Sequence, residues 1–372
     1  MSEPYLRVPK KLVFALVPLA LGILALEGGL RVAELRNEGP SADDTQTRYS
    51  LQVTTRGGVR LTRRWGAVGL VLDPILLYRT APNLRARGIT TNAQGFRGSR
   101  ETTRKKPPGT RRIVLIGGSA AFGWSASDDA HAPGALLEAE LARRSRPVEV
   151  IQAGCPAYTA TQEALYLSHE LIEYEPDLVI SLTGYNDLMA TQPGWFGADV
   201  FSQIERRLEP AYGLGSTLAN GTAIGRAISR RFEAPQSDAP AVLSASEAGA
   251  RFRRGALTMS ALVPDRLLVA LQPCFLAHPR GTRPKAEEEW LAQFIVGDRA
   301  RMEGLYASVR DEELAALREV EKRGARTVDL TAPFQNVDEM IFMDLCHLDD
   351  KGYELLARRL ADEVLAHPAF AR

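Results

Sequence analysis

Ile113-Val114-Leu115-Ile116-Gly117-Gly118-Ser119 is a continuous apolar run that ends in two glycines and a serine. Such a run is typical of a buried parallel strand that enters a tight turn. Short apolar runs recur along the chain and alternate with longer segments of helical period. We therefore expect strands at residues 113–116, 148–152, 178–182, 267–271 and 327–330. We expect helices at residues 133–144, 161–174, 312–323 and 352–365.

This alternation predicts an α/β fold with a five-stranded parallel sheet. In such a sheet the carboxyl ends of the strands face one crevice, so residues that follow different strands meet there. Ser119, Gly154 and Asn186 each follow a predicted strand. We expect these three residues to line the same crevice, although they are far apart in the sequence.

The residues at the strand ends indicate acyl transfer through a serine nucleophile. A serine hydroxyl attacks poorly until a base removes its proton. Among five histidines, His347 is the candidate base, and Asp344 can hold its imidazole in the required tautomer. The backbone N–H groups of Ser119 and Gly154 and the side-chain amide of Asn186 are the candidate oxyanion donors. We predict that position 154 is glycine because a side chain there would crowd the approaching carbonyl.

Each of these residues also has a plainer interpretation. Ser119 could be a small residue in a strand-to-helix turn, Asn186 a helix cap and His347 a surface residue. The glycines near Ser119 do not form the G-x-G-x-x-G pattern of a dinucleotide site. No metal site is expected, because the remaining histidines lack the spacing of metal ligands. These histidines are His131, His169, His278 and His367.

Four blocks of the sequence resemble those of the SGNH hydrolases, also called GDSL-like esterases. They are Gly117-Gly118-Ser119, Gly154, Gly184-Tyr185-Asn186-Asp187 and Asp344-Leu345-Cys346-His347. The resemblance covers about residues 111–366 and implies a three-layer flavodoxin-like fold. It also implies a Ser-His-Asp mechanism without metal or cofactor. Gly118 stands where the family has aspartate, which makes the first block less diagnostic but leaves the nucleophile assignment intact.

The N-terminus is expected to carry a targeting or anchoring signal. Residues 12–26 are uncharged and almost wholly apolar, and Arg7, Lys10 and Lys11 precede them. The run is shorter than the roughly 20 residues of a full membrane span. We interpret residues 1–36 as an uncleaved signal anchor or transmembrane segment; a cleaved signal peptide and a buried core helix are the alternatives. Because basic residues precede the run, the N-terminus is expected in the cytoplasm and the catalytic part in the periplasm or at the cell surface. The N-terminal run and residues 92–98 are also similar to those of membrane-tethered bacterial members of the family.

The rest of the chain divides by composition. Residues 37–110 are expected to form a linker and an extension that packs on the main domain. Residues 111–372 are expected to form the hydrolase domain, with an insertion at about 190–260 that is rich in Gly, Ala, Ser and Arg. Trp195 and Phe196 in this insertion are candidate substrate contacts, and a packing role is an equal alternative.

Overall composition excludes one class of partner. The chain has 46 basic and 45 acidic residues, a formal charge of +1, so no net field draws it to nucleic acid. Three cysteines are too few for a disulfide scaffold. Cys155, Cys274 and Cys346 are therefore expected to be small buried residues, with one oxidised pair as the alternative.

The sequence favours a serine esterase that cleaves O-acyl esters, in particular O-acetyl esters, through an acyl-enzyme on Ser119. The expected substrate is a small-molecule or polysaccharide ester, such as one on a cell-surface carbohydrate. An O-acyltransferase that uses the same residues is the first alternative. A non-catalytic carbohydrate-binding or scaffold protein is the second, and the intact Ser119, Asn186, Asp344 and His347 argue against it.

Overall fold

The computed structural model covers residues 1–372 and divides into two compact units. One unit comprises Met1–Arg60 and Asp199–Ala239, and the other comprises Leu61–Ala198 and Pro240–Arg372. The structure describes residues 18, 21–32, 52–53, 59–60, 70–86, 88–144, 146–191, 222–224, 243–295, 298–334 and 336–370. The predicted active-site residues all lie in the second unit.

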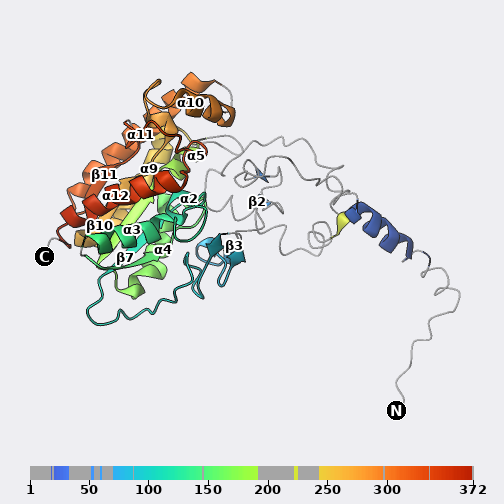
Figure 1. The fold of residues 1–372 in the computed structure, drawn as a ribbon, viewed down its shortest axis with the longest axis horizontal. Coiled ribbons are helices and arrows are strands. Elements are labelled where there is room, and N and C mark those ends of the chain that lie inside the picture. The colour runs from blue at the N-terminus through green and yellow to red at the C-terminus, as the bar shows by residue number, and fades with distance from the viewer. Residues whose placement is uncertain are drawn as a thin grey trace, which may run out of the picture. The chain divides into compact units, whose positions relative to one another are not determined.

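A five-stranded parallel sheet forms the centre of the second unit (Figure 1). Its strands follow the order β11-β10-β9-β7-β8, in which the first strand of the sheet along the chain, β7, pairs with both β8 and β9. This is the strand order of flavodoxin-like folds. The five strands are β7 (Arg112–Gly117), β8 (Glu149–Gln152), β9 (Leu178–Thr183), β10 (Leu267–Leu271) and β11 (Arg326–Asp329). The predicted parallel sheet of five strands is confirmed.

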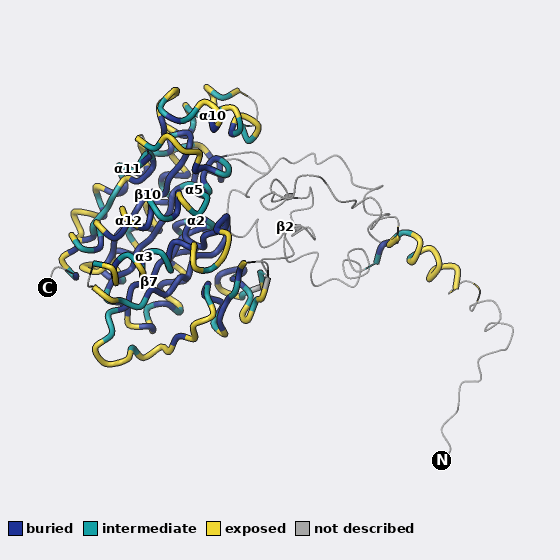
Figure 2. Tube along the Cα trace, viewed as in Figure 1, coloured by how far each residue is buried: buried dark blue, intermediate teal, exposed yellow. Residues whose placement is uncertain are grey.

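Every residue of β7, β9 and β10 is buried, as the dark tube through the middle of the unit shows (Figure 2). A strand covered on both faces has no solvent side, which is why these segments read as unbroken apolar runs rather than as alternating patterns. The edge strand β11 is only partly buried.

Helices pack in two groups against this sheet. α3 (Pro133–Arg143) packs on α12 (Asp350–Ala366), while α9 (Ala245–Leu262) packs between α4 (Ala160–His169) and α11 (Arg299–Glu321). The sheet and the two helical groups make up the three layers of an α/β fold (Figure 1). The shorter helices are α2 (Ser119–Phe122), α5 (Tyr185–Met189), α10 (Lys285–Leu291) and the 3₁₀ turns Leu171–Tyr174, Pro264–Arg266, Phe275–Ala277 and Ala292–Phe294.

Three helices differ from the sequence-based expectation. The helix predicted at residues 161–174 is divided into α4, which ends at His169, and the 3₁₀ turn Leu171–Tyr174. α11 begins at Arg299 rather than at residue 312, because the Asp298 side chain accepts hydrogen bonds from the first backbone N–H groups. α9 lies within the segment predicted to be an insertion, and it packs as part of the α/β layers. Its buried face includes glycine and alanine; Gly255, for example, has no room for a Cβ against the backbone of Ala160. Because most residues on the buried face of α9 are small, the sequence lacks the large apolar residues at helical spacing that would have predicted this helix.

Two short antiparallel hairpins precede the sheet within the same unit. They consist of β3 (Leu70–Asp73) with β4 (Leu77–Thr80), and β5 (Arg85–Ala86) with β6 (Ile89–Thr90). We call residues 70–104 the extension. It contacts the α/β layers through buried hydrogen bonds; the Tyr78 hydroxyl donates to Pro156 O at 3.2 Å, and the Tyr158 hydroxyl donates to Tyr78 O at 2.5 Å.

In the first unit, residues 21–32 form a helix with exposed apolar side chains such as Leu21, Leu24 and Leu26. Of the helices in the described part of the chain, none is long and apolar enough to cross a membrane. Most of residues 1–20 and of the predicted linker lies outside the described residues. Two short strands of this unit, β1 (Gln52–Val53) and β2 (Val59–Arg60), pair antiparallel.

Candidate active site

Ser119 is the first residue of α2, directly after the turn that ends β7. The turn needs glycine at position 117, where φ is +148° and a Cβ would lie 2.2 Å from Leu182 O. The chain therefore leaves the sheet sharply and presents the serine at the carboxyl edge of β7. This is the position expected from the sequence.

His347 and Asp344 lie in the loop before α12, and the structure brings both to Ser119. His347 Nε2 is 2.6 Å from Ser119 Oγ, and His347 Nδ1 is 2.6 Å from Asp344 Oδ2. The other carboxylate oxygen of Asp344 accepts hydrogen bonds from the backbone N–H groups of Cys346 and His347, each at 2.9 Å. Serine, imidazole and carboxylate thus form one continuous hydrogen-bonded chain across 228 positions of sequence.

The surroundings of Asp344 keep it ionised. Burial acts to raise the pKa of its carboxyl, but the His347 ring and the two backbone N–H groups outweigh burial, so the pKa lies below its ordinary value. A carboxylate on Nδ1 holds that nitrogen protonated and leaves Nε2 free to accept the proton of Ser119.

Gly154 and Asn186 lie close to the segment that carries Ser119, because a Cβ on Gly154 would meet Phe122 N of α2 and a Cβ on Gly118 would meet Asn186 Nδ2. The backbone N–H groups of Ser119 and Gly154 donate to no acceptor among the described residues, whereas those of Ala153 and Cys155 donate to strand carbonyls. The side chain of Asn186 is buried, and its Nδ2 donates to Tyr158 O at 2.8 Å. An amide nitrogen carries two N–H groups, so one remains for another acceptor.

The model of the GDSL-like Lipase/Acylhydrolase family matches residues 115–355, from within β7 to within α12. This chain belongs to that family. The family comprises ester-hydrolysing enzymes, and the chain is one of them.

Solved structures of similar proteins include a lipase/acylhydrolase from Enterococcus faecalis, at 16% identity over 69% of this chain and 96% of that chain, with a TM-score of 0.39. An acetylxylan esterase from Geobacillus stearothermophilus is similar at 16% identity over 68% of this chain and 93% of that chain, with a TM-score of 0.38. A comparison with curated proteins gave no match.

Gly118, which stands where the family has aspartate, has no room for a side chain in this structure. A Cβ on Gly118 would lie 2.2 Å from Asn186 Nδ2 and 3.3 Å from Tyr158 O. The amide of Asn186 thus occupies the space that a side chain at position 118 would need.

The expected reason for Gly154 is wrong. A Cβ there would lie 2.4 Å from Phe122 N and 2.6 Å from Ala121 C, so it would collide with α2. Close packing of the β8 turn against the helix of Ser119 requires the glycine.

Three carboxyl groups on α4, α5 and α11 are buried, those of Glu163, Asp187 and Glu313. Asp187 Oδ2 accepts from Ala160 N, at the start of α4, at 3.1 Å, and Glu163 Oε2 accepts from Ser181 Oγ at 2.5 Å. Burial raises the pKa of Glu163 to about 8 and that of Asp187 to about 7, and it holds that of Glu313 well above its ordinary value. Sequence reasoning missed Glu163 and Glu313. The available signal was an acidic residue inside an apolar helical stripe.

All three cysteines are free and buried, so the oxidised-pair alternative does not describe this structure. Cys346 Sγ lies 3.7 Å from His347 Nδ1, and with Asp344 these side chains form the one group in the described part of the chain whose atoms are spaced for a metal. Burial raises the pKa of the Cys346 thiol well above its usual range, which disfavours the thiolate that a metal would need.

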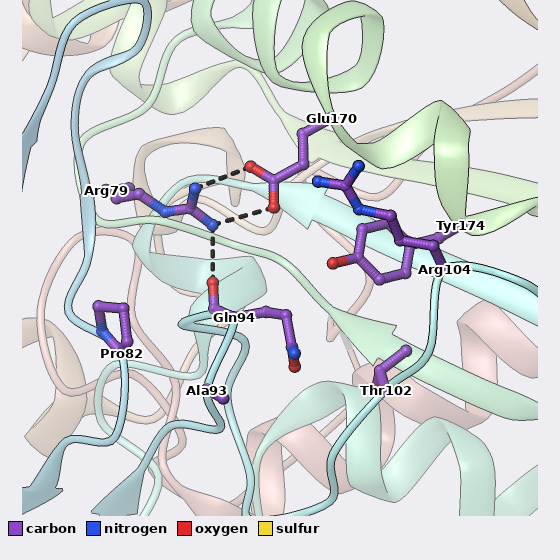
Figure 3. A pocket seen from close by; sticks show the side chains of 8 residues that line it. All are labelled: Arg79, Pro82, Ala93, Gln94, Thr102, Arg104, Glu170 and Tyr174. Atoms are coloured by element: carbon purple, nitrogen blue, oxygen red, sulfur yellow. Dashed lines mark hydrogen bonds and ion pairs between the residues drawn. The ribbon is translucent and has the colours of Figure 1, made fainter.

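The remaining predicted contacts, Trp195 and Phe196, lie outside the described residues. A cavity of about 440 Å³ lies elsewhere, between the extension and the end of α4 (Figure 3). Its Arg79 is bound to Glu170 at 2.8 Å and to the backbone oxygen of Gln94 at 2.6 Å, so its charge is already paired. None of the predicted site residues lines this cavity. We interpret it as a gap in the packing between the extension and α4.

Proposed function

We propose that the protein is a serine esterase that cleaves O-acyl esters through an acyl-enzyme on Ser119. The contact of 2.6 Å between Ser119 Oγ and His347 Nε2, with Asp344 on the other ring nitrogen, carries this proposal. Ser119 Oγ attacks the ester carbon while its proton passes to His347. Asp344 stabilises the imidazolium that forms.

The oxyanion of the tetrahedral intermediate accepts from the backbone N–H groups of Ser119 and Gly154 and from the second N–H of Asn186. Each such donor can lower the barrier by about 2.7 to 4 kcal/mol. When the intermediate collapses, His347 returns its proton to the leaving alcohol, and the acyl group stays on Ser119. Water then attacks the acyl-enzyme, with His347 as the base, and the acid leaves.

We further propose that the acyl group is acetyl and that the natural ester is on a cell-surface carbohydrate. Turnover of p-nitrophenyl acetate, compared with longer p-nitrophenyl esters, tests the acyl group. A matched Ser119→Ala protein tests the nucleophile; equal rates in the two proteins would leave only a carbohydrate-binding or scaffold role. Mass analysis of products from an acetylated polysaccharide tells hydrolysis from acyl transfer, because a transferase yields a new ester instead of free acetate.

A membrane-tethered, extracytoplasmic location is also a proposal. The exposed leucines of the helix at residues 21–32 and the apolar run before it support an attachment to lipid. Co-sedimentation of the full chain with phospholipid vesicles, against a protein that lacks residues 1–36, tests the attachment. Equal recovery in the supernatant would contradict it.

A further inference from the structure

Arg97 is an arginine of the extension whose side chain is almost completely buried in the α/β unit. Only 1% of the side chain is exposed. Its guanidinium makes four hydrogen bonds, to Asp129 Oδ1 at 2.9 Å, Phe122 O at 3.1 Å, Gly123 O at 2.6 Å and Gly88 O at 3.2 Å. It also lies over the Phe122 ring, 5.0 Å from the centroid. Arg97 lies outside the residues that match the family model.

Two of these bonds hold the end of the helix that carries Ser119. α2 has only four residues, so its last carbonyls have no partners within the helix. Arg97 Nη1 binds Phe122 O and Gly123 O, and Gln152 Nε2 binds Ala121 O and Phe122 O at 3.1 and 2.9 Å. A cation at a helix C-terminus is also favoured by the helix dipole.

The segment that Arg97 holds also connects to the histidine. Ser125, two residues after Gly123, donates from its hydroxyl to Leu348 O, next to His347. Trp124 N donates to Ser119 O at 3.0 Å, which ties the same segment back to the serine. The position of residues 122–125 therefore affects both ends of the Ser119–His347 contact.

Asp129 fixes the guanidinium from the other side. Its carboxylate accepts from the backbone N–H of Thr90 at 3.1 Å and from the Thr90 hydroxyl at 2.5 Å, in addition to Arg97. The extension is thereby locked to the loop that follows α2. Lysine could not replace this arrangement, because an ammonium is a single point that cannot reach acceptors on several sides at once.

We propose that Arg97 is a positioning residue for the reaction, which sets the alignment of Ser119 with His347 by holding the C-terminal end of α2. This inference rests on the proposed function. A displacement of about 1 Å in a reacting group can cost about 100-fold in rate, so loss of these bonds should lower kcat by about 10- to 100-fold. KM should change little, because the Arg97 side chain is buried and is not expected to contact the substrate.

The test compares Arg97→Lys and Arg97→Ala with Arg100→Lys in the full chain. Arg100 is a matched control three residues further along the extension, bound to Glu138 at 2.6 Å but half exposed. We expect kcat with p-nitrophenyl acetate to fall in both Arg97 variants and to stay near the wild-type value in Arg100→Lys. Guanidinium ion at a low, non-denaturing concentration should restore part of the kcat of Arg97→Ala and none of that of Ser119→Ala.

Thermal unfolding of each variant separates positioning from folding, with kcat measured well below each midpoint. A lower midpoint together with a wild-type kcat in folded Arg97→Lys would overturn the inference, even if Arg97→Ala does not fold. If the wild-type chain itself is no faster than Ser119→Ala, the proposed function fails instead. The two failures are therefore distinguishable.

Discussion

Replacing Glu163 by glutamine should stabilise the protein, and the gain should grow with pH. Glu163 is fully buried on α4, and its Oε1 has no hydrogen-bond partner among the described residues. Burial raises its pKa from 4.5 to about 8. The folded state thus binds this proton more tightly than the unfolded chain does. The stabilisation is complete below about pH 4.5 and is lost as the pH rises through about 8.

The size of the effect follows from that interval. At about 1.4 kcal/mol per pH unit, the rise from 4.5 to about 8 corresponds to about 5 kcal/mol of unfolding free energy. Glutamine has the shape of the protonated carboxyl and cannot ionise. The free energy of unfolding of Glu163→Gln minus that of the wild type should therefore increase with pH, by up to about 1.4 kcal/mol per unit.

Urea unfolding of both proteins at several values between about pH 5 and pH 8 measures this difference. The nearby Asp187 and Glu313 titrate in both proteins, so their direct contributions largely cancel. Glu289→Gln is the matched control; its carboxylate is 68% exposed, and its loss should change stability by less than about 1 kcal/mol. A difference between Glu163→Gln and wild type that stays constant across this range would refute the burial argument.

Three further substitutions test the site, each measured by steady-state kinetics with p-nitrophenyl acetate. Asn186→Ala should lower kcat by about 100- to 1,000-fold, because it removes one oxyanion donor, and should also lower the unfolding midpoint, because buried Tyr158 O loses the hydrogen bond from Asn186 Nδ2; a wild-type kcat would contradict the oxyanion role. Asp344→Asn should lower kcat by about 10,000-fold, because the amide favours the wrong tautomer of His347; a small effect would mean that the carboxylate is dispensable. Gly118→Ala should lower kcat at least about 10-fold, since its Cβ displaces the Asn186 amide; unchanged kinetics would show that the amide can move freely.

The sequence predicted the sheet well because its central strands are covered on both faces. Uninterrupted apolar runs such as residues 178–182 leave few alternatives, and the strand-end rule then places Ser119 and Asn186 together. His347 was identifiable for a different reason, since Asp344 three residues earlier offers a local partner. These signals are local in the sequence.

The features that the sequence did not reveal depend on contacts between distant segments. Arg97 is a charged residue whose burial is set by its contact with α2, and no local pattern shows that its side chain will be enclosed. Glu163 has a local signal, because it is an acidic residue inside an apolar helical stripe, but its partner Ser181 lies on the distant strand β9. The reason for Gly154 was missed in the same way, because its neighbour is the backbone of α2 rather than the substrate. α9 was missed because most of its buried residues are Gly, Ala or Ser, with only Phe252 and Met259 as large apolar residues.

The contacts of the extension bear on where the catalytic unit begins. The family match starts at residue 115, whereas the compact unit that contains the sheet starts at Leu61. A chain cut at residue 110 would keep Ser119, Asp344 and His347 but would leave Phe122 O and Gly123 O without Arg97. Phe122 O would keep the hydrogen bond from Gln152 Nε2 and Gly123 O that from Ala126 N, so the loss is that of two charged hydrogen bonds, each worth about 1.5 to 3 kcal/mol. We therefore expect such a fragment to fold less stably and to hold its serine less well aligned than a chain that begins before the extension.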